Sequence, residues 1–488
     1  MARGDQPIDH VLRRAGFGAN VSALSAYVGH SLSSVITSLV RYEQYPDDVD
    51  SRIGQSAYVG VTANGPFSPN TNIEHARQRW LFRMVHSQRP LQEKMALFWH
   101  NHFATAYSKI AGAVGAIPAT KMMALVSGEL PGPQGQLELF REHALGKFRE
   151  LLVEVARDPA MLVWLDGRLN TRVRPQENFG REIMELFTFG IGNYTEEDVY
   201  AAARVFTGWN LRTNPGFNGN DPNSFYEFVF NAAQHETAAK TFTFPIYPNG
   251  DRTIPSRPAA EGMQDGIDFI NALARHPQTA RRLARRLWNF FVSDLRPPDE
   301  MFIAEVASVY VRSDTDMREV VDTILRSRWF LDRDNYYARY SWPAEFVARA
   351  IREVGWTGFS VDTARNPMVN MGQQLFEPPD VNGWELGAGW YSTGTMLARM
   401  NFASTLAASQ RFNIAREVPA SAKASAPRFV EHFLSRYSPA PFDREPADAL
   451  VGYVENSTSA WSGTDAQVQA RGAGVSRLIV ASSEYQFI

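Results

Sequence analysis

Apolar residues recur at intervals of three and four along most of this 488-residue chain. Between residues 74 and 105 they include Trp80, Met84 and Leu91, and the same spacing continues between residues 137 and 165. That spacing gathers apolar side chains on one face of an α-helix, which can then be buried against other helices. Runs that alternate every second residue, as a strand requires, are few and short. We therefore predict a mainly α-helical protein.

The periodic segments are separated by glycine, proline and polar residues, so each predicts a helix of its own. Helices are expected at residues 74–105 with a break at Pro90, 137–165 with a restart at Ala160–Leu165, 177–189, 195–207, 261–275, 277–292, 299–311, 316–328, 341–354, 395–409, 427–436, 445–455 and 464–482. Two apolar runs, residues 225–230 and 240–244, are expected to pair as one short β-hairpin. The predicted fold is a single large multi-helix domain with at most that hairpin.

Three long segments rich in glycine, proline and asparagine interrupt the helices, at residues 42–72, 210–260 and 357–394. Loops of this length in a compact domain more often bind ligands or cover sites than merely connect elements. We therefore expect them to have a functional role.

The composition changes again near residue 417. The segment EVPASAKASAP is rich in alanine and serine, which is typical of a mobile linker. We therefore divide the chain into a main helical domain over residues 1–416, a linker over residues 417–427, and a small helical part over residues 428–488 that packs on the main domain.

Composition and charge exclude several classes of protein. The 44% hydrophobic and 21% charged residues are typical of a folded globular chain. Lys and Arg number 49 against 52 Asp and Glu, so no net basic charge supports a nucleic-acid partner. The absence of cysteine excludes disulfides, thiolate metal sites and a cysteine nucleophile. No apolar run approaches the roughly 18 residues of a membrane span, and the first residues lack the apolar core of a signal peptide, so a cytoplasmic protein is expected.

The segment FWHNHF at residues 98–103 carries two histidines separated by one residue. His100 and His102 would bind a divalent metal together if the backbone were extended, because both rings would then point to one side. On a continuous helix the two rings diverge by about 200°. The alternative is a core histidine bonded to a backbone carbonyl, with the other histidine at the surface.

A second candidate site lies in PQENFGREIMELF at residues 175–187. Helical spacing places Glu182 and Glu185 together beside the apolar face. Two such carboxylates suit a hard metal ion or an acid–base pair. Arg181 follows Glu177 by four residues, which is the spacing of an ion pair. The alternative is therefore a solvated acidic face braced by Arg181.

Two of the long loops carry further candidates. His235 lies in a polar loop between aromatic segments, a usual setting for a metal ligand or general base and equally for a surface histidine. Asp380, Trp384 and Trp390 lie in a loop rich in glycine and proline. The two indole rings are expected either to pack on the main domain or to form an aromatic platform for a planar or sugar-like substrate.

Other patterns have mainly structural explanations. Thr195 followed by Asp198 is close to a capping box, and Ser392 or Thr393 is expected to cap the helix that follows. The arginine-rich segment 275–286 predicts an amphipathic helix whose basic flank either binds an anion or is simply solvated. The chain contains no phosphate-binding loop, dinucleotide fingerprint, HExxH motif or GxSxG elbow.

Short motifs follow one another in order along nearly the whole chain. They are HVLRRAGFG at 10–18, WHNHF at 99–103, ENFGRE at 177–182 with ELFT at 185–188, YTEEDV at 194–199, TGW at 207–209, His235 ahead of Lys240, LWNFF at 287–291, PPDVNGW at 378–384 and SEYQ at 483–486. Together they resemble the bacterial domain-of-unknown-function 1800 family.

The resemblance implies a single, mainly helical domain in which the WHNHF, ENxxRE and DVNGW motifs are family hallmarks. It implies no established activity. Many relatives look exported, often through a twin-arginine signal, and are encoded near sulfatase-like proteins, so the resemblance implies a sulfatase-like partner. This chain departs from those relatives because it shows no such leader, and export is therefore the alternative to the expected cytoplasmic location. The chain has His235-Glu236 where relatives more often have His-Asp, which keeps an acidic neighbour.

Two functions fit these residues. The first is a metal-dependent enzyme, most simply a hydrolase and next a non-haem iron or manganese oxidoreductase, that binds a divalent ion and acts on a small molecule or glycan. The residues assigned to it are His100, His102 and Glu182 as metal ligands, Glu185, Arg181 and His235 in catalysis, and Asp380, Trp384 and Trp390 in substrate binding. The second is a non-catalytic helical scaffold that binds a protein or glycan partner, with the polar hallmarks in buried hydrogen-bond networks.

Overall fold

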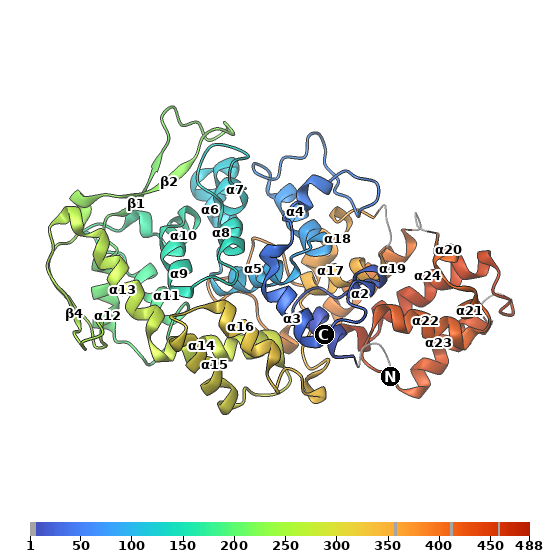
Figure 1. The fold of residues 1–488 in the computed structure, drawn as a ribbon. Coiled ribbons are helices and arrows are strands. Elements are labelled where there is room, and N and C mark those ends of the chain that lie inside the picture. Colours follow the sequence, from blue (N-terminus) through green and yellow to red (C-terminus); the bar gives the residue numbers. More distant parts are fainter. Residues whose placement is uncertain (1–5, 356–358, 410–412, 457–458) are drawn as a thin grey trace.

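The computed structural model describes residues 6–355, 359–409, 413–456 and 459–488. Its regular structure is almost entirely helical, which confirms the predicted fold class (Figure 1). The helices of the N-terminal part are α1 (Pro7–Arg14), α2 (Val21–Ser25), α3 (Leu32–Val40), α4 (Ile73–His86), α5 (Pro90–His102), α6 (Tyr107–Val114), α7 (Ala116–Ala124), α8 (Gln136–Glu142), α9 (Phe148–Arg157), α10 (Pro159–Trp164), α11 (Glu177–Glu185) and α12 (Glu196–Val205). Those that follow are α13 (Met263–Arg275), α14 (Pro277–Leu287), α15 (Glu300–Arg312), α16 (Met317–Arg326), α17 (Pro343–Val354), α18 (Asp362–Asn370), α19 (Thr393–Ala408), α20 (Ile414–Glu417), α21 (Ala420–Lys423), α22 (Ala426–Tyr437), α23 (Arg444–Asn456) and α24 (Asp465–Ala481).

The starts of the predicted helices follow local chemistry. Thr195 accepts a hydrogen bond from the main-chain N–H of Asp198, whose side chain in turn binds the N–H of Thr195, so the capping box is complete. Ser392 caps α19 by accepting from the N–H of Thr395. Asp158 caps α10 by accepting from the N–H of Met161. These local signals explain why the order of the predicted helices is largely correct.

Several helices lie outside the segments whose periodicity predicts them. α6 and α7 are separated by Gly115, which adopts a φ of +93°, and α7 carries Pro118 in its first turn. α18 contains Pro367 within the helix. Glycine and proline weaken a helical pattern in the sequence, and here tertiary packing compensates, as the burial of Ile110 on α6 shows.

The strands pair differently from the prediction. β1 (Trp209–Thr213) pairs antiparallel with β2 (Tyr226–Phe230), and β3 (Lys240–Thr241) pairs with β4 (Thr253–Ile254). The predicted hairpin between residues 225–230 and 240–244 is therefore wrong. Trp209 determines the pairing, because its buried ring packs edge-on against Phe228 of the partner strand.

The helices form one elongated body with α4, α5 and α17 near its middle (Figure 1). α12, α13 and the β3–β4 pair lie at one end, and α22, α23 and α24 lie at the other. α24 packs along α19, and α22 packs against α17. The segment 417–427, expected to be a linker, contains α21 and the start of α22. None of the described helices has the length and hydropathy of a membrane span.

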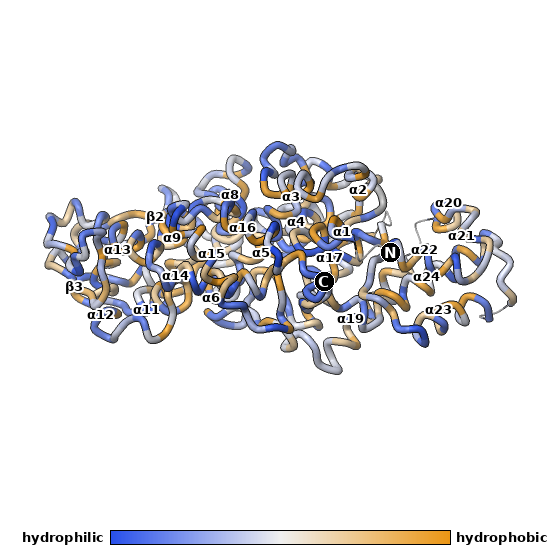
Figure 2. Tube along the Cα trace, turned by 60° about the horizontal axis from the view of Figure 1, so that its bottom comes forward, coloured by the Kyte–Doolittle hydropathy of each residue, from blue (hydrophilic) through white to orange (hydrophobic). Residues whose placement is uncertain are grey.

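Amphipathic helices build the core. Figure 2 shows apolar and polar residues alternating along them, clearly in α23, where Leu450 and Val454 are the buried residues. α5 departs from this pattern, since all of its residues from Leu91 to His102 are buried. A helix that is buried on every side must find a partner for each polar side chain it carries.

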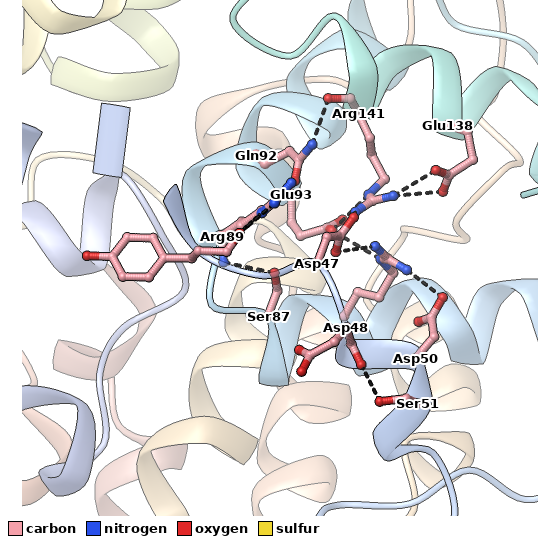
Figure 3. A network of polar contacts seen from close by, with 12 residues as sticks. Asp47, Asp48, Asp50, Ser51, Ser87, Arg89, Gln92, Glu93, Glu138 and Arg141 are labelled. Carbon is pink, nitrogen blue, oxygen red and sulfur yellow. Dashed lines mark hydrogen bonds and ion pairs between the residues drawn. The ribbon is translucent and has the colours of Figure 1, made fainter. Parts of the chain in front are cut away.

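The segment 42–52, part of a predicted functional loop, is held down by a network of ion pairs. Arg83 and Arg141 each bind both Asp47, at 2.7 and 2.6 Å, and Glu93 of α5, at 3.2 and 2.9 Å. Figure 3 shows Asp47, Glu93 and Arg141 converging between the loop and the helices. Although burial alone would raise the pKa of Asp47, the two arginines hold it below its ordinary value. These ion pairs therefore hold Asp47 of the loop against α4, α5 and α8.

Candidate functional site

Two of the three candidate metal ligands, His100 and His102, lie on α5. The polar side chains of this helix bind groups from several segments of the chain, although Gln92 Oε1, Glu93 Oε2 and His102 Nδ1 are buried without a hydrogen-bond partner among the described residues. Gln92 donates to the carbonyl of Arg141, Glu93 accepts from Arg83 and Arg141, Lys94 binds the Gly16 carbonyl and Glu345, His100 binds the N–H of Phe376, Asn101 binds the N–H of Trp384, and His102 binds the carbonyl of Phe187. The Asn101 contact joins residues 283 positions apart. The side chains of α5 therefore hold together segments that come from most of the length of the chain.

His100 lies on the side of α5 that faces the 371–392 segment. Its Nε2 accepts a hydrogen bond from the N–H of Phe376 at 3.2 Å. The rings of Trp80 and Trp384 pack against the imidazole, with centroids 5.3 Å away in both cases. Burial lowers the pKa of His100 to about 3, so the ring is neutral and its Nε2 serves as an acceptor.

His102 points to another part of the core. Its Nε2–H donates to the carbonyl of Phe187 at 3.0 Å, and the rings of Trp99 and Phe103 pack against it. Burial lowers its pKa well below the ordinary value, and the positive charges of Arg286 and Arg282 lower it further. The two histidines therefore use their Nε2 atoms on main-chain groups that belong to different segments.

Asn101 joins two of the family motifs. Its Oδ1 accepts a hydrogen bond from the N–H of Trp384 at 2.7 Å. Gly383 adopts a φ of +84°, and a Cβ at that position would overlap the side chain and the carbonyl of Asn101. The glycine is thus required both by the backbone conformation and by the close approach of α5. WHNHF and PPDVNGW form one packed unit.

The candidate substrate-binding residues are placed differently from one another. Trp384 and Trp390 are both buried, and Trp390 packs near Trp342 with ring centroids 6.2 Å apart. Asp380 is exposed and its Oδ1 accepts from the N–H of Asn382, which closes a tight turn. In this conformation neither indole ring offers a face to a ligand.

Glu182, Glu185 and Arg181 lie on α11. Arg181 binds both oxygens of Glu196 on α12, at 2.8 and 2.7 Å, and lies 3.5 Å from Glu177, as the spacing predicts. Glu185 accepts a hydrogen bond from the hydroxyl of Tyr194. Glu182 is half-buried, and within the described part of the chain its carboxylate forms no hydrogen bond or ion pair. Burial raises the pKa of Glu182, the charge of Glu185 raises it further, and Arg181 opposes both.

The basic flank of α14 meets this region. Arg282 donates to the carbonyl of Leu186 at 3.3 Å and lies near Glu185, whose charge raises its pKa against the lowering effect of burial. Arg286, one turn later, is half-buried, and burial, with a smaller effect of Arg282, lowers its pKa to about 10. The structure therefore brings His102 and Glu185 together with two arginines.

His235 lies in a separate buried network. Its Nδ1–H donates to the carbonyl of Thr207 at 2.8 Å, and its Nε2 lies 3.3 Å from Asp265. Asp265 also accepts from Lys240 at 2.5 Å and from Arg257 at 2.6 Å. These contacts tie the loops around residues 230–260 to α13. Among the described residues, no group of three or more histidine, aspartate and glutamate side chains could hold a metal ion.

A turn that precedes α11 was not among the candidates. Residues 168–174, RLNTRVR, carry three arginines, of which Arg172 and Arg174 are exposed and Arg168 is half-buried. Leu169 and Val173 between them are 54% and 87% exposed. No carboxylate in the described ranges forms an ion pair with any of the three arginines. The spacing of these arginines, three in seven residues without an acid, is the signal that could have found the turn.

The contact between Gly383 and Asn101 predicts an unequal effect of two alanine substitutions. Gly383→Ala and Gly216→Ala both place a side chain at positive φ, which costs about 1–2 kcal/mol, but a Cβ on Gly216 would meet no atom within 4 Å. We expect Gly383→Ala to lower the free energy of unfolding by about 1–3 kcal/mol more than Gly216→Ala, because of the overlap with α5. Urea unfolding measures both. Equal losses would contradict the joining of the two motifs.

The buried neutral His100 predicts a dependence of stability on pH. Its folded pKa of about 3 lies below the ordinary value of 6.5, so the unfolded chain takes up the proton first as pH falls. The contribution of His100 is therefore full above about pH 6.5 and is lost as pH falls toward 3. His100→Gln keeps an acceptor for Phe376 but cannot titrate.

We expect the free energy of unfolding of His100→Gln to fall less steeply between pH 6 and 4, by up to about 1.4 kcal/mol per pH unit. Urea titrations at a series of pH values measure the slope. His30→Gln, at an exposed position, is the matched control and should keep the wild-type slope. A His100→Gln slope equal to that of the wild type would show that the ring takes up its proton as readily in the fold as in the unfolded chain.

Comparison with known proteins agrees with the motifs. The family model described as "Protein of unknown function (DUF1800)" matches residues 10–487. No curated protein and no solved structure matches the chain. The matched range begins at His10, the first residue of the HVLRRAGFG motif, and ends one residue after the SEYQ motif. Because the match spans nearly the whole chain, the protein belongs to the DUF1800 family.

Proposed function

We propose that this protein is a non-catalytic helical scaffold that binds an acidic segment of another protein. One observation carries the scaffold part: several of the polar motif residues are engaged by groups of the chain itself. Asn101 binds the main chain of Trp384, His235 binds Thr207 and Asp265, and Arg181 binds Glu196. Buried polar groups that satisfy one another stabilise and specify a fold.

The arginine turn, residues 168–174, supports an acidic partner. Arg172 and Arg174 lie in solvent on either side of the exposed Val173, and no acid of the described chain neutralises them. Arginine is enriched among the residues that dominate protein interfaces, because its planar group binds carboxylates through two hydrogen bonds. Two arginines beside an apolar side chain favour a segment that alternates acidic and apolar residues.

Hydrogen bonds to neighbouring segments fix the backbone of the arginine turn. Buried Asn170 donates to the carbonyl of Ala203 at 2.8 Å and accepts from the N–H of Gln176 at 3.0 Å. The N–H of Arg172 donates to the carbonyl of Gln234 at 2.8 Å. Because the backbone is already ordered, binding at the turn does not require the chain to lose much conformational entropy. An exposed basic turn with a fixed backbone is suited to docking a partner.

Charge reversal at the turn tests this proposal. We expect a fluorescein-labelled peptide of alternating Glu and Leu to bind the wild-type protein, and to bind Arg172→Glu/Arg174→Glu at least tenfold more weakly. Fluorescence anisotropy at low and high salt measures the affinity, which should fall with salt for every protein that keeps Arg172 and Arg174. Arg312→Glu/Arg428→Glu, at exposed arginines elsewhere, is the matched control.

The same peptide with Gln in place of Glu should not bind. Equal affinity of the acidic peptide for the wild type and both variants would contradict the docking site. Binding of a polyuronate chain without binding of the peptide would replace the protein partner by an acidic glycan. The sulfatase-like partner implied by the family resemblance can be tested in the same assay.

A metal-dependent enzyme is a second candidate, and one observation favours it. Glu182 is half-buried with a raised pKa and no partner in the described chain, one helical turn from Glu185. An unpaired carboxylate in such a position is a candidate ligand or general base. In this proposal the Nδ1 of His102, which is buried without a hydrogen-bond partner, is the ring nitrogen left for coordination. Arg282 and Arg286 beside it oppose a cation.

Elemental analysis of the purified chain separates the two proposals. The scaffold proposal expects a wild type that keeps less than stoichiometric metal and whose thermal unfolding ignores a chelator. The enzyme proposal expects about one divalent ion for each chain, released in Glu182→Ala and Glu185→Ala but retained in Glu177→Ala, whose carboxylate only pairs with Arg181. Metal bound equally by all three variants would exclude Glu182 as a ligand.

A further inference from the structure

A cavity of about 430 Å³ lies between the N-terminal segment and the central helices. Its walls come from α1, the segment around α2, α3, the turn between α4 and α5, and α17. The volume falls within the range of about 300–1,000 Å³ that is usual for small-molecule sites. The functions proposed above do not use this cavity, and it is separate from the arginine turn.

Arg352 of α17 lines the cavity. Its Nη1 donates to the carbonyl of Val85 at 3.2 Å, while its Nε is buried without a hydrogen-bond partner among the described residues. No carboxylate in the described ranges forms an ion pair with it, and Glu353, the next residue, binds Arg349 at 3.1 Å. Burial lowers the pKa of Arg352, and the charges of Tyr27 and Glu353 oppose this effect only in part.

Two tyrosines line the same cavity as this guanidinium, Tyr27 and Tyr45. Burial raises the pKa of Tyr27, a hydrogen bond with Ser38 lowers it, Tyr45 raises it, and the positive charge of Arg352 lowers it. The cavity wall therefore carries two phenol hydroxyls and one guanidinium.

Part of the remaining wall is apolar. Leu12, Ala19, Ala23 and Pro90 line it, and Gly18 lies beside them with a φ of +73°. His30, Ser87 and Gln88 add further polar groups. Small residues leave room for a guest, while their apolar surface favours hydrocarbon over water. The wall thus combines a guanidinium and hydroxyls with an apolar part that suits a hydrocarbon body.

We propose that this cavity binds a small organic carboxylate with an apolar chain or ring. The carboxylate would accept hydrogen bonds from Arg352, the pairing that a guanidinium forms best, and from the hydroxyls of Tyr27 and Tyr45. The hydrocarbon part would lie against Leu12 and Ala23. This site does not depend on the function proposed above, because neither Arg172 nor Glu182 contributes to it.

Octanoate serves as the probe, with 1-octanol as its uncharged match. We expect calorimetry to show saturable binding of octanoate to the wild-type protein and a rise in its melting temperature. 1-Octanol should bind at least tenfold more weakly. Arg352→Gln, which removes the charge of the guanidinium but keeps a polar side chain, should lower the affinity for octanoate at least tenfold, and Arg312→Gln at an exposed position should not.

A second variant keeps the test decisive if Arg352→Gln does not fold. Ala23→Phe fills the cavity from a half-buried position without changing the guanidinium, and it should abolish octanoate binding while leaving the circular dichroism spectrum unchanged. The proposal is overturned if octanoate does not bind the wild type, if 1-octanol binds equally well, or if Ala23→Phe or a folded Arg352→Gln keeps the wild-type affinity. Inorganic phosphate that binds where octanoate does not would also overturn it.

Discussion

The need to satisfy every polar group on a fully buried helix organises this structure. α5 carries Glu93, Lys94, His100, Asn101 and His102 in the core, where an unpaired polar group costs about 1–3 kcal/mol and an unpaired charge more. These side chains bind groups from several separate parts of the chain, with His100 and Asn101 both bound to the 371–392 segment. Helices and loops far apart in sequence must therefore pack against α5 in one arrangement. A shifted arrangement would leave several buried polar groups without hydrogen-bond partners at once.

This constraint explains why the family motifs resemble catalytic motifs. Histidines, amides and carboxylates are the residues that catalysis uses, and they are also those that can form two-sided hydrogen bonds inside a core. His100 accepts from a main-chain N–H, whereas His102 donates to a main-chain carbonyl, so the two rings serve opposite roles. Lys94, whose pKa burial lowers to about 7 against the effect of Glu345, shows how far the core perturbs a buried charged group.

Sequence alone predicted what local chemistry decides. The capping box of Thr195 and the cap by Ser392 depend on residues within one helical turn, so their pattern is visible in the chain. The pairing of residues 225–230 was wrong, because the competing strand lies upstream and Trp209 selects it through tertiary packing. The packing of His100 against Trp384 likewise depends on contacts between residues hundreds of positions apart. A single sequence does not reveal such contacts.

The contrast between satisfied and unsatisfied charge separates the structural residues from the candidates for function. Glu93 and Glu345 are deeply buried, and the chain supplies arginines for both. Among the described residues, Arg172 forms no ion pair although its backbone is hydrogen-bonded, and Arg352 forms none beside a cavity. Arg14 also forms no ion pair with a described acid, but it is buried and donates to three main-chain carbonyls. A missing acid therefore marks a candidate where the guanidinium faces solvent or a cavity, and anionic groups of a partner or ligand are the groups we propose to pair with Arg172 and Arg352.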